Sequence, residues 1–488
     1  MEPYTYPADC FFKSLEDIKG KKITIMGLGL NGGGQAAVRF FLKHGAFLTV
    51  TDMKTEEELS PTLRALEKDI QKYRDNITFV LGRHDIQDFS QADVVIKNPG
   101  VKIQGNKYLA AAKAIETDIS VFLKFTQAPI IAVTGSKGKS STVSAIHYGL
   151  QNAGFKTFLG GNITVSPLTF LEETDKNTPV VLELSSWQLA DLRGRGLLKP
   201  FIALLTLIVP DHQNWYGSME SYVADKKLIY RDQDCRQWTV CSTDYWGSVF
   251  ASETKAQKLF YDTKPLPPQS YGAFFDGDTG YLFLPSYEKP QPVIESLVVP
   301  GKHMRINALN AALVMALMGI GPTKISSILS QWPGLPHRLE FFHKATLHDQ
   351  QICFYNDSAA TVPEATVAAV EAFHSQLHLI CGGTDKNLDF LPLASALEKN
   401  PPFSVCLLEG TGTDKLIKIL KEKNIPYYGP FPALQDLLEH LKTSILPSVP
   451  EDKKSAPVVF SPGATSFGMF KNEFDRGNTF KAEVLSLF

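Results

Sequence analysis

The stretch TGSKGKSST, residues 134–142, could bind a phosphate chain. It follows the apolar run APIIAV and precedes a helix expected over residues 139–153. Backbone N–H groups of such a glycine turn and of the helix N-terminus hold phosphate oxygens. Lys139 would reach the terminal phosphates, and Ser140 would coordinate magnesium. We predict an ATP-phosphate site formed by Gly135, Ser136, Lys137, Gly138, Lys139, Ser140 and Ser141.

One residue of this loop narrows the class of nucleotide-binding protein. Val133 stands where the common phosphate loop has its first glycine, five residues before the glycine of the GK pair. The shortened loop argues against a GTPase or an ordinary ATPase motor. The alternative interpretation is a glycine turn that binds neither phosphate nor metal.

Three polar residues follow predicted parallel strands. Glu183 ends the run PVVLE, and Asp211 and His212 come just past FIALLTLIV. Because the carboxyl ends of parallel strands share one edge of a sheet, we expect Glu183 beside the phosphate loop, where a carboxylate can bind magnesium. The alternatives are a solvated glutamate at a strand end and an ordinary loop histidine.

The helix expected for SMESYVADKKLIYRD carries a lysine on its apolar face. By 3.6-residue periodicity, Tyr222, Val223, Lys226, Ile229 and Tyr230 share that face. An ammonium group is costly among apolar side chains, so the lysine must extend to solvent, meet an anion or be held neutral. A neutral amine could be carbamylated by carbon dioxide, which would supply a further carboxylate for a metal.

The stretch GLGLNGGG, residues 27–34, predicts a second nucleotide site. Gly27, Gly29 and Gly32 have GxGxxG spacing after the strand KKITIM, and Asp52 ends the next strand. Both details suit the pyrophosphate of a dinucleotide, and taken alone they favour NAD.

Short β-branched runs alternate with helical patterns along the whole chain, which predicts parallel α/β layers. Residues from about 235 to 300, rich in Pro and Gly turns, are expected to form a small, partly antiparallel region, followed by a long helix over Asn307–Met318. We predict three α/β domains: a Rossmann-like domain over residues 1–117, a central P-loop ATPase-like domain over 118–334 and a Rossmann-like C-terminal domain over 335–488.

Composition excludes several classes of protein. The net charge of −2 leaves no basic surplus for nucleic acid, and the longest apolar stretch, FIALLTLIV, is too short to span a bilayer. The N-terminal residues lack the pattern of a secretory signal. The six cysteines have neither metal-ligand nor disulfide spacing, so we expect them to be reduced core thiols in a cytoplasmic protein. These cysteines are Cys10, Cys235, Cys241, Cys353, Cys381 and Cys406.

Together these motifs resemble those of the Mur ligases, the ATP-dependent amino-acid ligases of peptidoglycan synthesis. The matching stretches cover nearly the whole chain in order: TGSKGKSST, GGN at Gly160, ELSSWQL at Glu183, DH at Asp211, the Lys226 helix, GLPHR at Gly334, NDSAAT at Asn356, GGTDK at Gly382 and SPGATSFGMFKNEFDRGN at Ser461. Within the family, ELSSWQL and the FKN…RGN segment resemble the members that add D-glutamate to UDP-N-acetylmuramoyl-L-alanine.

The resemblance implies a role for each matched position. Lys139 and Ser140 would bind the ATP phosphates and a first magnesium ion together with Glu183. His212 and a carbamylated Lys226 would hold a second magnesium ion. Asp211 would lie beside the reacting groups. Contacts to the nucleotide itself would come from Asn307, Arg338 and Asp357.

The same resemblance implies two substrate sites. The UDP substrate would contact Gly29, Leu30, Asn31, Asp52, Asn98, Gly100, Asn162 and Ser185. D-Glutamate would contact Thr361, Lys386, Ser466 and Phe470. The implied enzyme is a cytoplasmic monomer that works through an acyl phosphate, with no nucleic acid or membrane as partner. GLGLNGGG would then hold the pyrophosphate of a sugar nucleotide and not that of a redox cofactor.

Several positions depart from the family pattern. Met304 replaces a frequent asparagine, Ala359 a frequent lysine and Val362 a frequent asparagine, and KNEFDRG shifts an aromatic residue by one place. Three other functions stay open on the sequence: a different amino-acid ligase such as another Mur ligase or a folylpolyglutamate synthase, a nicotinamide dehydrogenase with an accessory ATPase domain, and a nucleotide sensor without catalysis.

Overall fold

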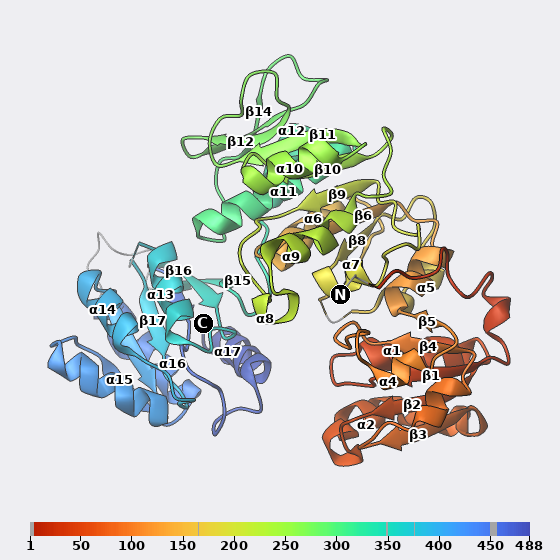
Figure 1. The fold of residues 1–488 in the computed structure, drawn as a ribbon. Helices are drawn as coiled ribbons and strands as arrows, with labels where there is room; N and C mark the ends of the chain where they lie inside the picture. The colour runs from red at the N-terminus through yellow and green to blue at the C-terminus, as the bar shows by residue number, and fades with distance from the viewer. Residues whose placement is uncertain (1–3, 164, 348–349, 375, 449–455) are drawn as a thin grey trace. The chain divides into compact units, whose positions relative to one another are not determined.

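The computed structural model describes residues 4–163, 165–347, 350–374, 376–448 and 456–488. The described chain forms two compact units (Figure 1), one comprising residues 1–293 and 309–326 and the other residues 294–308 and 327–488. The first unit contains two sheets and the second contains one.

The first sheet is a five-stranded parallel sheet that places the GLGLNGGG turn. Its strands, in spatial order, are β3 (Ile77–Leu81), β2 (Phe47–Asp52), β1 (Lys22–Met26), β4 (Val94–Lys97) and β5 (Ile115–Glu116). The helices between and after these strands are α1 (Gly33–Lys43), α2 (Glu56–Lys72), α3 (Ile86–Ser90), α4 (Lys107–Ala110) and α5 (Asp118–Phe125). This topology is that of the Rossmann-like domain expected from the sequence.

The second sheet has nine strands and carries the phosphate loop. Its spatial order is β14 (Gln291–Ile294), β13 (Thr279–Phe283), β12 (Gly272–Asp276), β11 (Gln257–Asp262), β10 (Trp238–Ser242), β9 (Ile202–Leu205), β6 (Ile130–Thr134), β8 (Val180–Glu183) and β7 (Phe158–Gly161). Strands β7 to β12 pair in parallel, whereas β12 and β13 are antiparallel. The expected antiparallel region is therefore confirmed, and it extends the edge of the central sheet.

Helices around the second sheet position the polar residues of interest. They are α6 (Lys139–Ala153), α7 (Ser186–Ala190), α8 (Gln213–Tyr216), α9 (Met219–Lys226), α10 (Tyr245–Glu253), α11 (Lys302–Leu317) and α12 (Pro322–Leu329). The expected helix over residues 139–153 is confirmed at both ends, where Gly138 and Gly154 cap it in left-handed conformations. The long helix α11 begins five residues earlier than expected, directly after Gly301 with φ of 101°.

The third sheet, in the second unit, has one antiparallel edge. Its order is β15 (Glu340–Leu347), β16 (Gln350–Asn356), β20 (Val458–Phe460), β17 (His378–Cys381), β18 (Ser404–Leu408) and β19 (Tyr428–Phe431). Strands β15 and β16 pair antiparallel and the remaining described pairs are parallel. The helices are α13 (Pro363–Ala372), α14 (Leu391–Lys399), α15 (Thr411–Glu422), α16 (Leu434–His440) and α17 (Glu473–Leu487).

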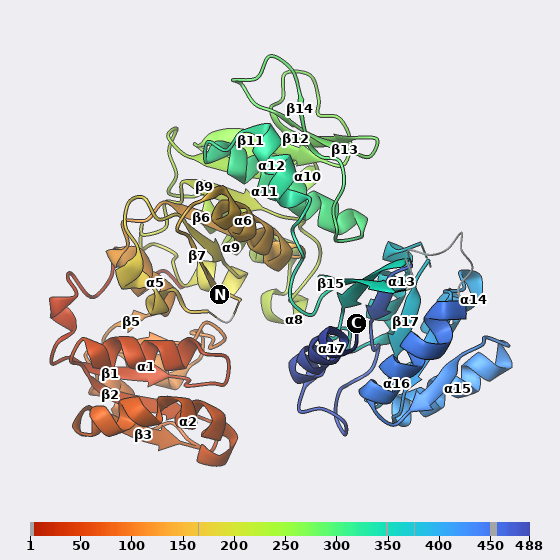
Figure 2. The ribbon, with the colours of Figure 1, turned by 180° about the vertical axis from the view of Figure 1, so that it is seen from behind.

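Alternation along the strands of the third sheet divides its core into two layers. Leu379 and Cys381 pack with α13, α14 and α15, whereas Ile380 packs with α16 and α17. Seen from opposite sides in Figures 1 and 2, the strands run between these two sets of helices. Successive residues of a strand point to opposite faces, so each strand contributes to both cores.

One expectation about the cysteines is wrong. Cys235 is exposed in the polar turn before β10, and Cys353 is half-buried, while the other four are buried; all six are free thiols. Among the described helices, none is both long and apolar enough to cross a membrane.

Candidate active site

The phosphate loop joins β6 to α6 in a conformation that requires glycine. Gly135 has a φ of 149°, and a Cβ there would lie 1.9 Å from the Thr206 hydroxyl oxygen. Gly138 has a φ of 90° and forms the N-cap of α6. The two glycines let the backbone turn tightly over the end of β9 and leave the N–H groups at the start of α6 able to meet an anion.

Two lysines meet at a single carbonyl oxygen of this loop. The Lys139 Nζ donates to the Gly135 oxygen at 2.9 Å and to the Ser136 oxygen at 3.0 Å. The Lys226 Nζ donates to the same Gly135 oxygen at 2.8 Å. The structure thus brings together two residues that lie 87 positions apart in the sequence.

Lys226 does not extend to solvent. Its side chain is about 1% exposed, and its Nζ lies 4.5 Å from the centroid of the Tyr222 ring. Burial lowers the pKa of Lys226 to about 7, and the nearby positive charge of Lys139 adds to this effect. Burial also lowers the pKa of Lys139. Two ammonium groups this close repel each other, so the neutral form of Lys226 is favoured.

Sequence reasoning missed the residue that connects α9 to the phosphate loop. The Tyr222 hydroxyl donates to the Ser136 Oγ at 3.1 Å, and that Oγ donates in turn to the Val209 carbonyl oxygen at 2.9 Å. Tyr222 stands one helical turn before Lys226, so the i, i+4 spacing was a usable signal. Its ring and hydroxyl set the positions of the lysine and of the loop together.

Glu183 ends β8 with one carboxylate oxygen satisfied and one not. Its Oε1 accepts a hydrogen bond of 2.8 Å from the Asn162 amide. Its Oε2 is buried and, among the described atoms, has no hydrogen-bond partner. Gly161 allows this close approach, because a Cβ there would lie 2.1 Å from the Glu183 carbonyl oxygen. A buried carboxylate oxygen without a donor is suited to a cation.

Asp211 and His212 lie in the loop between β9 and α8. The Lys137 Nζ lies 3.6 Å from the Asp211 Oδ2, so Asp211 faces the phosphate loop. Burial alone would raise the Asp211 pKa, but the charges of His212 and Lys137 outweigh it and the pKa is lowered. His212 is exposed, has a φ of 51° and lies with its ring 4.9 Å from the Trp187 ring.

The GLGLNGGG turn is organised by a carboxylate. The Asp52 Oδ2 accepts from the Gly29 N–H at 2.9 Å, and the Thr62 hydroxyl donates to the Gly29 oxygen at 2.8 Å. Leu30 and Asn31 at the tip of the turn are exposed. Asp52 is itself buried, so it shapes the turn from below.

The Asn98–Val101 turn lies against this glycine loop. A Cβ on Gly27 would lie 3.2 Å from the Asn98 Cβ, and the Asn98 Oδ1 accepts from the Gly100 N–H at 3.1 Å. Ser185, the remaining residue predicted to touch the UDP substrate, caps α7, where its Oγ accepts from the Gln188 N–H.

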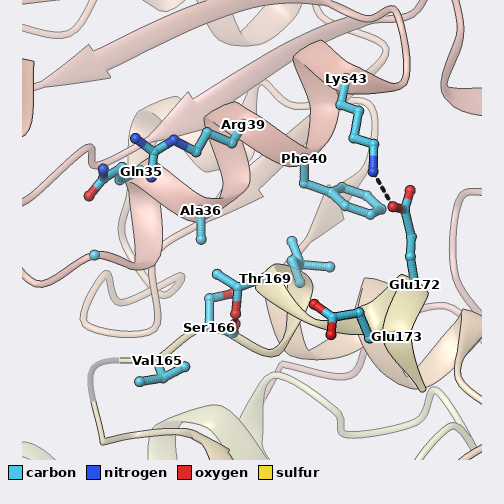
Figure 3. A pocket seen from close by; sticks show the side chains of 12 residues that line it. Gln35, Ala36, Arg39, Phe40, Lys43, Val165, Ser166, Thr169, Glu172 and Glu173 are labelled. Atoms are coloured by element: carbon cyan, nitrogen blue, oxygen red, sulfur yellow. Dashed lines mark hydrogen bonds and ion pairs between the residues drawn. The ribbon is translucent and has the colours of Figure 1, made fainter. Parts of the chain in front are cut away.

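A pocket of about 530 Å³ extends from the end of the glycine turn along α1. Figure 3 shows the α1 side chains facing a segment that contains two short 3-10 helices, Pro167–Thr169 and Leu171–Glu173, with Lys43 paired to Glu172. The lining residues are Gly32, Gln35, Ala36, Arg39, Phe40, Lys43, Val165, Ser166, Leu168, Thr169, Glu172 and Glu173.

In the second unit, the predicted nucleotide residues occupy different environments. Asp357 follows β16 and is buried; its Oδ2 accepts from the Ser461 hydroxyl at 2.7 Å and its Oδ1 from the Leu339 N–H at 3.1 Å. Burial raises the Asp357 pKa to about 7. Arg338 is exposed, and Asn307 is buried one turn after Met304 on α11.

A second pocket, of about 310 Å³, lies at the glycine-rich ends of β17 and β18. Among the described residues, its lining includes Ser466 and Phe470 and does not include Thr361 or Lys386. Lys386 is exposed. Arg476 of FKNEFDRGN lines this pocket too; its guanidinium donates to the Ala464 and Ser358 oxygens at 3.0 and 2.8 Å. Arg476 was not among the predicted site residues, although it lies in the FKNEFDRGN motif.

The fold and site are typical of nucleotide-binding α/β proteins: two lysines and a buried glutamate flank a phosphate loop. A model described as "Mur ligase MurD-like, N-terminal domain" matches residues 21–121, and one described as "Mur ligase middle domain" matches residues 133–315. The chain belongs to the Mur ligase family.

Two relatives agree with this assignment. The chain is 40% identical to the "UDP-N-acetylmuramoylalanine--D-glutamate ligase" of Treponema pallidum (strain Nichols), over 96% of this chain and 98% of the relative. It is 40% identical to the enzyme of the same name from Borreliella burgdorferi (strain ATCC 35210), over 97% of this chain and 99% of the relative.

The fold is shared with more distant members of the family. A UDP-N-acetylmuramate-alanine ligase MurC from Thermotoga maritima aligns with a TM-score of 0.54 at 18% identity, over 96% of this chain and 99% of that one. MurF from Acinetobacter baumannii aligns with a TM-score of 0.56 at 16% identity, over 90% and 91%. The expected three-part α/β fold is confirmed.

Proposed function

We propose that this protein ligates D-glutamate to UDP-N-acetylmuramoyl-L-alanine at the expense of ATP, in the synthesis of peptidoglycan precursors. The observation that carries the proposal is the arrangement of Lys139, Lys226 and Glu183 around the phosphate loop. The full-length similarity to relatives named for this reaction supports the choice of substrates. A dehydrogenase would leave these three residues unexplained.

The reaction must activate a carboxylate before an amine can attack it. The carboxylate of the sugar-nucleotide substrate attacks the γ-phosphorus of ATP, which gives an acyl phosphate and ADP. Negative charge gathers on the γ-phosphate oxygens, where Lys139 and the N–H groups at the start of α6 would stabilise it. The neutral amine of D-glutamate then attacks the acyl carbon, and phosphate leaves.

The donor set fits magnesium. Ser140, Glu183, His212 and a carbamylated Lys226 would hold two ions, and bound magnesium would neutralise charge on the phosphate oxygens. The unpartnered Glu183 Oε2 supports this assignment. Across the described residues, no group of three or more His, Cys, Asp and Glu side chains could hold a metal, but the proposed set draws on Ser140 and the lysine.

Carbamylation of Lys226 is supported by its electrostatics. Carbon dioxide reacts with neutral amines, and a pKa near 7 leaves a large neutral fraction at physiological pH. Replacing Lys226 with Ala should abolish activity, and short carboxylic acids should restore part of it. Failure of every such acid to restore activity would count against the carbamate.

The amine of D-glutamate needs a base; Asp211 would serve, or His212 if it does not hold a magnesium ion. Asp211 faces the phosphate loop through its contact with Lys137. We further propose that Ser466 and Phe470, which line the 310 Å³ pocket, contact D-glutamate. Thr361 and Lys386 would contact it from outside that lining.

The first sheet would hold the uridine diphosphate through Gly29, Leu30, Asn31, Asp52, Asn98 and Gly100, while Asn162 and Ser185 would contact the substrate beside Glu183. Nucleotide contacts to ATP would come from Asn307, Arg338 and Asp357. We propose the domain limits 1–117, 118–334 and 335–488, and the matches over residues 21–121 and 133–315 support the first two. We further propose a cytoplasmic monomer that needs neither membrane nor nucleic acid.

The decisive experiment measures phosphate release from ATP with UDP-N-acetylmuramoyl-L-alanine and a series of amino acids. We expect release that depends on D-glutamate and on magnesium, with ligated product detected by mass spectrometry. Dependence on L-glutamate or on another amino acid would redirect the proposal to a different ligase. Binding of ATP without release under any combination would identify a nucleotide sensor instead.

A further inference from the structure

Lys97, the last residue of β4, is a buried lysine with three anchors. It is about 3% exposed. Its Nζ donates to the Asn98 oxygen at 3.1 Å and to the Val101 oxygen at 3.0 Å, and it lies 2.8 Å from the Asp191 Oδ2. The two contacts with carbonyl oxygens are hydrogen bonds, and the contact with Asp191 is a buried ion pair.

Two of these contacts fix the turn that lies against the glycine loop. Within the turn, the Val101 N–H donates to the Asn98 oxygen at 3.0 Å. The Lys97 ammonium adds a donor to that oxygen and reaches the carbonyl at the far end of the turn. Asn98 and Gly100 are proposed to contact the UDP. Lys97 therefore stabilises the conformation of a turn that contacts the substrate, while its own side chain stays buried.

The third contact crosses to the second sheet. Asp191 directly follows α7, the helix that Ser185 caps two residues after Glu183. The other carboxylate oxygen of Asp191 accepts from the Tyr6 hydroxyl at 2.7 Å. A continuous set of contacts therefore links the Asn98–Val101 turn through Lys97 and Asp191 to α7, which follows the end of β8.

A second buried pair reinforces this junction. The Arg195 guanidinium donates to the Glu116 Oε1 at 2.8 Å and to the Ile115 oxygen at 2.6 Å. Its Nε donates to the Asp191 oxygen at 2.9 Å. Buried charges are costly unless they are paired and hydrogen-bonded, and removing one partner of such a pair leaves an uncompensated charge.

The exposed pair Lys43–Glu172 offers a natural contrast. It also joins α1 of the first sheet to the segment after β7, as Figure 3 shows, but its side chains are 61% and 42% exposed. Exposed pairs of this kind contribute little and are screened by salt. Like Lys97, Lys43 connects the first sheet and its helices to a segment that belongs to the second sheet. Unlike Lys97, Lys43 is exposed and, within the described part of the chain, does not donate to the carbonyl oxygens of a turn.

We propose that Lys97 is a positioning residue for the sugar nucleotide, which orders the Asn98–Val101 turn and holds it in register with Asp191 and the end of β8. This inference rests on the proposed function, because it takes the turn to be part of the UDP site. The substrate carboxylate that is activated lies far from the uridine group. The uridine site and the phosphate loop must therefore keep a fixed separation, so that the carboxylate reaches the phosphate loop when the uridine group is bound.

The test compares Lys97→Met with Lys43→Met. Calorimetry would measure binding of UDP, and steady-state kinetics would give KM for each substrate. For Lys97→Met we expect UDP affinity to fall about tenfold or more, as loss of a buried charged donor implies, with a matching rise in the KM for UDP-N-acetylmuramoyl-L-alanine. The KM for ATP should change less than about twofold, and Lys43→Met should leave all three values within about twofold.

A second variant separates positioning from stability. Lys97→Met with Asp191→Asn removes both charges and keeps an acceptor for Tyr6, so we expect it to fold at least as well as the single variant. Weak UDP binding by a double variant with a restored melting temperature supports the inference. Recovery of UDP affinity along with the melting temperature would overturn it, as would equal changes in every KM.

Failure of the proposed function would look different. A wild-type protein that binds UDP but ligates nothing would defeat the proposed reaction, and the UDP measurements would still decide the role of Lys97. A wild-type protein that does not bind UDP would overturn the inference about Lys97 itself.

Discussion

Two glycine loops of this chain look alike locally and differ in their surroundings. Each follows an interior strand and opens a helix, β1 into α1 and β6 into α6. Each helix has a left-handed glycine as its N-cap, Gly32 with φ of 85° and Gly138 with φ of 90°. Both turns therefore present backbone N–H groups to an anion.

The side chains around the loops make the difference. Lys139 and Lys226 converge on the carbonyl oxygen of Gly135, whereas the carboxylate of Asp52 accepts from the N–H of Gly29. Cations near a phosphate stabilise charge that develops during reaction, but a carboxylate beneath a turn fixes the shape of the turn. A glycine motif thus predicts a phosphate site, and the side chains around the motif indicate whether a reaction takes place there.

Among the substitutions that compare the two glycine loops, removal of the buried lysine of the phosphate loop should have the largest effect. Lys139→Ala should lower the rate of D-glutamate-dependent phosphate release by about 10³-fold, because a charge-stabilising donor is lost. Lys137→Ala, in the same loop but with a side chain 68% exposed, should lower it by less than about tenfold. Similar rates for the two variants would contradict the prediction that the buried lysine of this loop contributes more to catalysis than the exposed one.

Adding a methyl group to each loop probes their packing. Gly135→Ala drives a Cβ to within 1.9 Å of the Thr206 hydroxyl and should cost about 2 kcal/mol or more in unfolding free energy. Gly29→Ala, at φ of 61° with open space around it, should cost roughly 1 kcal/mol. Denaturant titration of both variants measures the difference, and an equal cost would show that backbone conformation alone governs both loops.

The pH dependence of stability tests the electrostatics of the phosphate loop. The Lys226 pKa is about 7 in the folded protein, below its usual value of about 10.4. Between these values the unfolded chain binds more protons, so wild-type stability should rise with pH relative to Lys226→Met, by at most about 1.4 kcal/mol per pH unit. Below pH 7 the difference should be constant.

This measurement uses buffer free of carbon dioxide, so that carbamylation does not contribute. A flat difference between pH 7 and 9 would mean that Lys226 keeps its ordinary pKa, and would remove the physical basis for a neutral amine.

The smallest effect is expected at the first loop. Asp52→Asn keeps the size of the side chain but weakens its acceptor to the Gly29 N–H, so UDP affinity should fall about threefold to tenfold. ATP affinity should not change. Calorimetry with UDP, ATP and NAD measures all three, and a variant or wild type that prefers NAD would contradict the assignment of this loop to a sugar nucleotide.

Much of the fold was predictable because local patterns agree with tertiary packing. The residues 139–153 form a helix bounded by two glycines, as the pattern predicts. The apolar face that includes Tyr222 and Lys226 is buried as periodicity indicates. The start of α11 was not predictable from apolar periodicity, since its first turn, KHMRI, is mostly polar.

The candidate site was predictable only where a motif carried it. Glu183 follows from its place at the end of a parallel strand. The contact of Tyr222 with Ser136 and the contact of Lys97 with Asp191 join residues 86 and 94 positions apart. No local pattern encodes such pairs, because their partners are chosen by how the strands and helices pack.

The amino-acid sequence suffices to define the family, the two glycine loops and the lysine on an apolar helix face, because these depend on local spacing and on chemistry that few residue types can perform. The folded chain decides the charge states. Lys226 has a lowered pKa because packing excludes water and places Lys139 against the same carbonyl oxygen. Likewise, Glu183 keeps an unpartnered oxygen because Asn162 reaches one of its two oxygens. Burial and distance set these properties, and both arise when distant segments come together.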